Sequence, residues 1–148
     1  MALLNYTTQI EAIKTVGEIQ GILAAHGAKS ILVDYADDKT VEALSFRVLT
    51  SHGEVGIRLP IDCDAVLKVL TNQNRRGKVP TRFVNRAQAT RVAWRIVKDW
   101  VEAQMAILET EMVKMEQIFL PYVITDTGRT LYEAMADRHF QLGPGEGD

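Results

Sequence analysis

The residues of this 148-residue sequence whose types and spacing could do chemistry are mainly basic. Between Arg75 and Lys98 the chain contains eight Lys or Arg residues and no Asp or Glu. The eight are Arg75, Arg76, Lys78, Arg82, Arg86, Arg91, Arg95 and Lys98. Phosphate binding requires Lys and Arg side chains that converge without competing carboxylates. This window is therefore the candidate binding site for nucleic acid or another phosphate-rich ligand.

The overall charge of the chain conceals this basic window. The formal net charge is -2, with 17 Lys or Arg residues against 19 Asp or Glu residues. Residues 99–148 are strongly acidic, and residues 1–74 are mildly so. Such a distribution produces a local positive potential on a nearly neutral protein. The same arrangement would also serve self-association of a basic face with an acidic face, so a homo-oligomer is an open alternative.

The eight basic residues fall into two groups, according to the elements that must position them. The first group, Arg75, Arg76, Lys78 and Arg82, is expected on a long loop over residues 71–85, which contains Asn72, Asn74, Gly77 and Pro80. The second is expected on the helix that follows: Arg86 at its start, then Arg91, Arg95 and Lys98 on one strip, about a turn apart. Phe83 and Trp94 are the aromatic neighbours on which bases could stack.

The helix strip also has a purely structural interpretation, which competes with the functional one. A charged strip on an otherwise apolar helix is usually a solvated face. The spacing also permits ordinary i,i+4 ion pairs, Arg95 with Asp99 and Lys98 with Glu102. Tryptophans at helical spacing, such as Trp94 and Trp100, more often belong to a core than to a stacking platform.

Other kinds of chemistry find little support in the sequence. His26, His52 and His139 are far apart, and the single Cys63 excludes a zinc site built on cysteines of one chain. There is no Walker loop, no Gly-x-Gly-x-x-Gly motif and no nucleophile elbow. We therefore predict no catalytic residues, no metal ligands and no cofactor.

The apolar spacing of the first half predicts a helix, an antiparallel meander of three strands, and a second helix. The helix is expected over 16–26, opened by a Thr15–Glu18 capping box, and Asp62 is expected to cap the second helix, through about residue 70. The strands are expected over 31–35, 44–49 and 55–59. A short strand or arm could precede them over residues 3–10.

The second half is expected to be helical. Asn85 caps a long helix, with Gln88 at the capping-box position, that either runs to about residue 118 or bends near Thr110. Its apolar arc covers roughly 220°, so this helix is central or is buried in an oligomer. Beyond it, residues 122–124 form a short strand or an extended segment, and a capping box at Thr130 opens a last helix to about Phe140.

These elements predict an α+β fold, in which helices cover an antiparallel sheet of three or four strands and a long central helix dominates the C-terminal half. One domain is expected over 1–142, made of a sheet-containing half (1–70), the basic loop (71–85) and a helical half (86–142). The tail, 143–148, is expected to be disordered. The chain has no apolar run that could span a bilayer and no secretory signal, so we expect a soluble, cytoplasmic protein.

Two segments of the second half carry a resemblance. Residues 86–100, RAQATRVAWRIVKDW, and 119–133, FLPYVITDTGRTLYE, resemble small uncharacterised proteins of phages and other mobile elements. The resemblance implies a phage-type origin and a role in DNA metabolism or in the suppression of host defence. It implies no roles for individual residues.

The leading hypothesis is a non-enzymatic protein that binds nucleic acid, single-stranded or without sequence preference, through the basic loop and the helix strip. The alternative is a phage-encoded inhibitor or interaction protein that binds a host protein or sequesters a small signalling nucleotide. The broad apolar arc of the long helix motivates this alternative, because any exposed part of it would require a partner.

Overall fold

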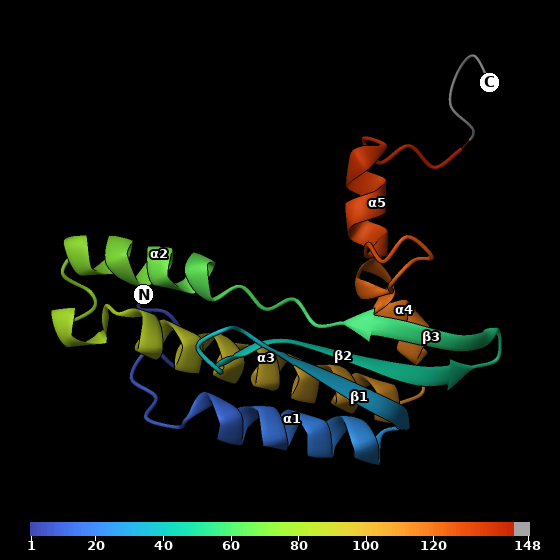
Figure 1. The fold of residues 1–148 in the computed structure, drawn as a ribbon, viewed down its shortest axis with the longest axis horizontal. Helices are drawn as coiled ribbons and strands as arrows, with labels where there is room; N and C mark the ends of the chain where they lie inside the picture. Colours follow the sequence, from blue (N-terminus) through green and yellow to red (C-terminus); the bar gives the residue numbers. More distant parts are fainter. Residues whose placement is uncertain (144–148) are drawn as a thin grey trace.

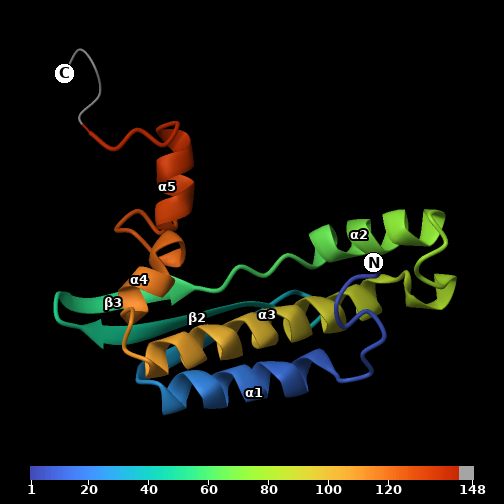
Figure 2. The ribbon, with the colours of Figure 1, turned by 180° about the vertical axis from the view of Figure 1, so that it is seen from behind.

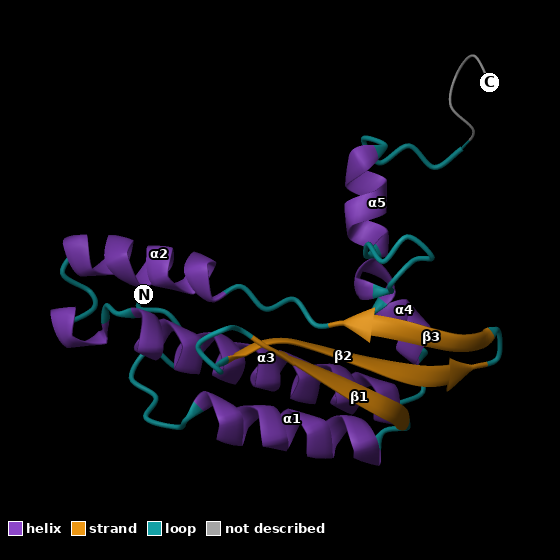
Figure 3. Cartoon of the chain, in the orientation of Figure 1, coloured by secondary structure: helices purple, strands orange, loops and turns teal. Residues whose placement is uncertain are grey.

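A three-stranded antiparallel sheet lies across two helices in the computed structural model, which describes residues 1–143 (Figures 1 and 3). The strands, in the order β1-β2-β3, are β1 (Ala28–Tyr35), β2 (Val41–Thr50) and β3 (Gly53–Arg58). The two helices, α1 (Ala12–Ala25) and α3 (Arg86–Glu109), run side by side in the same direction behind one face of the sheet (Figure 2). The predicted α+β class and the three-strand meander are confirmed.

The principal core lies between this sheet and the two helices. Alternate residues of β2, among them Leu44 and Phe46, meet Leu23 of α1 and Val101 of α3, and all four are at most 2 % exposed. The apolar arc of α3 is thus covered mainly within the chain, which confirms that this helix is central. Trp94 is fully buried, so it belongs to the core and cannot stack on a base.

The first helix begins earlier than predicted, at Ala12, with Glu11 in the N-cap position. Thr15 is not a cap: it lies inside the helix, fully buried, and its hydroxyl accepts a hydrogen bond from Arg95 Nη1 at 3.4 Å. The helix ends where Gly27 adopts a φ of 98°, as expected of a C-terminal glycine. Residues 3–10 form turns rather than a strand.

The predicted loop over 71–85 is wrong for residues 71–75, because these residues form the last part of the helix α2 (Cys63–Arg75). Its start is as expected, with the Asp62 carboxylate accepting the Ala65 N–H at 3.0 Å. The polar residues of the last turn and a half do not interrupt it, because they bond to other segments: Gln73 Oε1 accepts the Leu3 N–H at 2.9 Å. A 3-10 turn, η1 (Thr81–Phe83), occupies the later part of the predicted loop.

The long helix α3 starts and stops at residues that the sequence indicates. Asn85 Oδ1 accepts the Gln88 N–H at 2.8 Å, so Asn85 is the cap, although the Gln88 amide donates to the carbonyls of Tyr6 and Thr8 instead of closing a capping box. The helix ends at Glu109 with Thr110 as C-cap, so the alternative of a break near Thr110 is correct and a continuous helix to 118 is wrong.

The chain then turns through two short elements, α4 (Met115–Ile118) and η2 (Leu120–Tyr122), before α5 (Leu131–Asp137). Of the segment expected to be extended over 122–124, Tyr122 belongs instead to η2, and Val123 and Ile124 make only isolated bridges, Ile57 with Val123 and Ile124 with Thr130. Of the predicted tail, 143–148, only Gly143 lies within the described residues. Within residues 1–143, no helix has the length and apolar character needed to cross a membrane.

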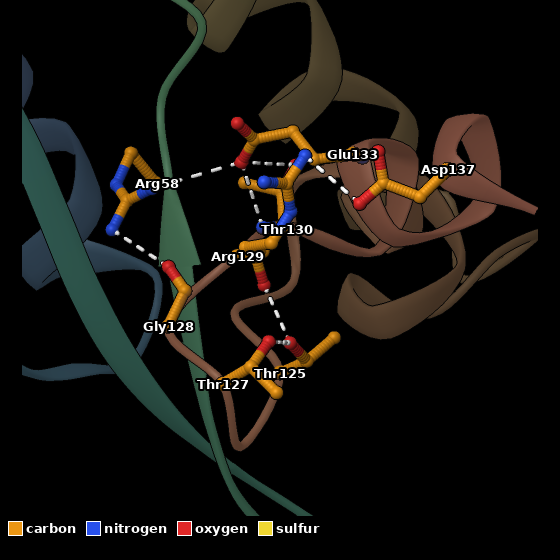
Figure 4. A network of polar contacts seen from close by, with 8 residues as sticks. All are labelled: Arg58, Thr125, Thr127, Gly128, Arg129, Thr130, Glu133 and Asp137. Atoms are coloured by element: carbon orange, nitrogen blue, oxygen red, sulfur yellow. Dashed lines mark hydrogen bonds and ion pairs between the residues drawn. The ribbon is translucent and has the colours of Figure 1, made fainter.

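Helix α5 stands away from the sheet and helices and is held at its base by polar contacts (Figures 1 and 4). The predicted capping box is confirmed: Thr130 Oγ1 accepts the Glu133 N–H at 3.2 Å, and Glu133 Oε1 accepts the Thr130 N–H at 2.9 Å. Arg58 of β3 lies 3.9 Å from Glu133 and donates to the Gly128 carbonyl at 3.3 Å. One of the contacts that attach α5 to β3 therefore uses an ionised carboxylate, beside backbone contacts such as that of Ile124 N–H with the Gly56 carbonyl.

We expect this attachment to be sensitive to acid. Hydrogen bonds from Thr130 lower the pKa of Glu133, and Arg129 and Arg58 lower it further. Because the folded-state pKa is lowered, the stabilisation is complete above the unfolded-state value of about 4.3 and is lost as the pH falls through the folded value. A carbon-13 NMR titration should give a Glu133 midpoint below that reference, and Thr130→Val should move it upward. An unchanged midpoint in the variant would contradict this account.

Candidate functional site

The helix α2 and the start of α3 form a hairpin at one end of the molecule, and its turn carries four of the predicted site residues (Figure 1). A C-terminal glycine motif builds this turn: Gly77 has a φ of 73°, its N–H donates to the Asn74 carbonyl at 3.0 Å, and the Lys78 N–H donates to the Gln73 carbonyl at 2.9 Å. We call the exposed basic residues on and beside this turn the basic tip: Arg75, Arg76, Lys78 and Arg82.

The basic tip rests on a small core of its own. Leu70 of α2, Val79 after the turn and Ala89 of α3 are at most 2 % exposed and pack together, and the N-terminal segment, including Leu3, covers them. The Asn74 side chain donates to the Val79 carbonyl at 2.8 Å. The backbone that presents the four basic side chains is therefore held by packing and hydrogen bonds, in place of the long loop that the sequence predicted.

The segments that build this end of the molecule contain no carboxylate side chain. Neither residues 1–10 nor residues 65–98 include an Asp or Glu. In the part of the chain that the structure describes, no member of the basic tip lies within 4.0 Å of a carboxylate oxygen. The tip thus presents four cationic side chains to solvent without a carboxylate partner among residues 1–143. This is the local condition that phosphate binding requires.

Phe83 is placed under a guanidinium group. The Arg82 Cζ atom lies 4.7 Å from the centroid of the Phe83 ring, a cation–π geometry. Phe83 is half-buried, and its ring meets that of Tyr6 edge to face with centroids 5.4 Å apart. The aromatic ring therefore supports the planar Arg82 head group, and it is not itself the open platform that the sequence suggested.

The helix strip, Arg91, Arg95 and Lys98, is a different environment from the basic tip. Arg95 Nη1 lies 2.6 Å from Glu18 Oε2 of α1. Arg91 Nη1 lies 3.9 Å from Glu11 Oε1, and Arg91 also donates to Gln88 Oε1. Lys98 Nζ lies 3.1 Å from Glu102 Oε2. The side chains of the strip are only 14 to 24 % exposed. The predicted Lys98–Glu102 pair is confirmed, whereas Arg95 pairs with Glu18 rather than Asp99. Arg91 and Arg95 join α3 to Glu11 and Glu18 at α1, whereas Lys98 pairs within α3, and none of the three extends the open basic surface.

Arg86 lies between these two groups and belongs to a cleft that the sequence did not reveal. The cleft has a volume of about 540 Å³ and lies where the N-terminal ends of α1 and α3 meet the turn between β1 and β2. Arg86 is exposed and pairs with Asp64 of α2. Thr40 in the turn bonds to Asp38 and lowers the pKa of that carboxyl, with Arg86 contributing.

Residues of mixed charge line this cleft, among them Glu11, Asp38, Lys39, Arg86 and Arg91. Next to it, burial raises the pKa of the Cys63 thiol. No group of three or more His, Cys, Asp or Glu side chains within residues 1–143 is arranged to hold a metal ion. The residues that line the cleft come from segments far apart in the sequence, and no local pattern could have grouped them.

Comparisons with known proteins do not assign this site. No protein-family model, curated protein or solved structure matches the chain. The resemblance of residues 86–100 and 119–133 to small phage proteins stays a prediction. The chemistry of the basic tip therefore provides the argument for function.

Proposed function

We propose that this protein binds nucleic acid through the basic tip, as a binding protein rather than an enzyme. One observation carries the proposal: four exposed cationic side chains lie on and beside a hydrogen-bonded hairpin turn, in segments free of Asp and Glu. The proposed site is smaller than the window from Arg75 to Lys98, because the helix strip has carboxylate partners within the fold. Arg86 lies outside it, paired with Asp64.

The tip is suited to binding without sequence preference. Contacts between Lys or Arg and phosphate oxygens position a nucleic acid but carry no sequence information. The one planar group at the tip is the Arg82 guanidinium, backed by Phe83, and an unpaired base of any kind can stack on such a plane. We therefore favour a single strand over a duplex.

The long helix α3 adds to the field at the same end of the molecule. The helix dipole places a partial positive charge at the N-terminal turn, near Arg86 and the end of η1. The C-terminus of α2 places an opposite partial charge at the tip, and Arg75 in its last turn offsets part of that charge. The three remaining members of the tip lie beyond the helix end and are available to a ligand.

A salt titration tests the proposal. Four phosphate contacts to a single strand give a slope of about -3 for the logarithm of the binding constant against the logarithm of salt concentration. We expect this slope from fluorescence anisotropy with a labelled single-stranded oligonucleotide of about 20 nucleotides, starting near 50 mM salt. An absence of binding at the lowest salt, or an affinity independent of salt, would overturn the proposal.

Exposed apolar side chains favour a second function, that of an interaction protein. Leu32 of β1 and Leu49 of β2 are 61 and 66 % exposed, and Tyr132 of α5 is 56 % exposed. On α3, the helix that motivated this alternative, Ile107 is the most exposed large apolar residue, at 40 %, so most of the exposed apolar surface lies on other elements. A phage-type inhibitor of a host protein would use these surfaces rather than the basic tip. If the protein does not bind nucleic acid but captures one defined host protein, this second function is favoured.

A further inference from the structure

Strand β1 leaves one edge of the sheet without a partner. The order β1-β2-β3 places it at the side of the sheet, and β2 alone pairs with it (Figure 3). Among residues 1–143, no hydrogen bond from outside the sheet engages the backbone of Ala28–Tyr35. The outward N–H and C=O groups of β1 are therefore available to another strand.

The middle of this edge carries no protecting feature. Natural sheets protect exposed edges with charged side chains, bulges or very short strands. The irregularities of β1 lie at its two ends, between Ala28 and Ser30 and between Asp34 and Tyr35, and its charged residues, Lys29 and Asp34, lie near those ends. Between them the strand reads Ser-Ile-Leu-Val, and its leucine, Leu32, is 61 % exposed. A regular, uncharged middle with an exposed leucine is suited to strand pairing.

The two faces of β1 restrict how a second strand can pair with it. Ile31 and Val33 pack against the principal core, whereas Ser30, Leu32 and Asp34 alternate with them on the open face. Directly opposite residues in an antiparallel pair point to the same face. A symmetric pairing of β1 with itself therefore places either a core-side residue or an open-face residue at its centre.

We propose that β1 pairs antiparallel with β1 of a second copy of this chain, centred on Leu32, to form a continuous six-stranded sheet. This register places Leu32 opposite Leu32 of the second copy. It places Ile31 opposite Val33, and Ser30 opposite Asp34, each twice by symmetry. The Ser30 hydroxyl, which already accepts from Arg47 Nε at 2.9 Å, has its own hydrogen to donate to the Asp34 carboxylate.

The neighbouring symmetric registers are poorer matches. Centring on Ile31 places Leu32 opposite Ser30, and centring on Val33 places Leu32 opposite the Asp34 carboxylate. Only the Leu32-centred register places Leu32 opposite an apolar side chain and gives the Asp34 carboxylate a hydrogen-bond donor opposite it. This self-complementarity is what favours a second copy over an unrelated strand as the partner. The dimer uses a surface different from the basic tip, so it does not depend on the proposed function.

The first test compares two exposed leucines on the open face of the sheet. Leu32→Lys places two ammonium groups opposite each other in the dimer, whereas Leu49→Lys changes an equally exposed residue on β2, away from the edge. Light scattering should give about twice the chain mass of 16.5 kDa for the wild type and for Leu49→Lys. The dimer dissociation constant of Leu32→Lys should be raised at least about tenfold. A monomeric wild type, or equal dimerisation of both variants, would overturn the proposal.

A crosslinking test fixes the register. Cys63 is the single cysteine, so the test begins from a Cys63→Ser background. Leu32→Cys in that background should form a covalent dimer on mild oxidation, because the two side chains lie opposite each other, and Leu49→Cys should not. The dimer should also persist at about 0.5 M salt, where contacts between exposed charges are screened. Dissociation by salt would indicate pairing of the basic end with acidic surfaces and would overturn the β1 interface.

Discussion

Replacing the four basic-tip residues, Arg75, Arg76, Lys78 and Arg82, by Gln is expected to weaken binding to a single-stranded oligonucleotide by roughly 10⁴-fold near 50 mM salt. The size of this loss follows from the release of ions on binding. Four phosphate contacts give a slope of about -3 for the logarithm of the binding constant against the logarithm of salt concentration, and this slope is applied between 50 mM and about 1 M salt. The slope of the variant should be close to zero. Fluorescence anisotropy at several salt concentrations measures both quantities.

A variant with the same charge but a different location provides the control. Lys14, Lys29, Lys39 and Lys68 are also exposed and have no ion pair among the described residues. Changing these four to Gln lowers the net charge from -2 to -6, as the basic-tip variant does. The control should lose much less affinity and keep most of the salt slope. Equal losses in the two variants would mean that total charge, and not the basic tip, governs binding.

Phe119→Ala is expected to lower the free energy of unfolding by about 3 to 5 kcal/mol. Phe119 is fully buried after α4, and its ring meets Phe46 and Trp100 edge to face, with centroids 5.6 and 5.5 Å away. Removing the ring leaves a cavity and ends both aromatic contacts. Urea unfolding, followed by linear extrapolation, gives the change in the free energy of unfolding.

The adjacent Leu120 is the matched control for this variant. It is 50 % exposed, so Leu120→Ala should cost no more than about 1 kcal/mol. The difference matters for the architecture, because Phe119 is where the segment after α3 enters the principal core. Similar losses in both variants would show that this segment is not anchored at Phe119.

The local elements of the fold could be read from the sequence because their causes are local. Asp62 and Asn85 cap helices through hydrogen bonds to residues only three positions away, and Thr130 does the same for α5. The strands of the meander alternate in apolar character, and Gly27 ends the first helix through its own backbone freedom. Such signals depend on neighbours within one turn or one strand.

The errors arose where a distant segment determined the outcome. Residues 71–75 read as a loop, yet Gln73 bonds to the N-terminal segment and Leu70 is buried under it, so the helix continues. The spacing of Thr15 and Glu18 is that of a capping box, yet Thr15 is buried against α3 and Glu18 pairs with Arg95. Local spacing could not indicate either tertiary contact.

The sequence alone determined the fold class, the helix caps at Asp62, Asn85 and Thr130, and the concentration of positive charge between Arg75 and Lys98. Tertiary structure decided which of those charges are available. It brought the carboxylates of Glu11 and Glu18 beside α3, 77 to 80 positions away in the chain, and left the basic tip among segments without Asp or Glu. The physical reason is that ion pairing acts over a few ångströms in space, whatever the separation of the two charges along the chain.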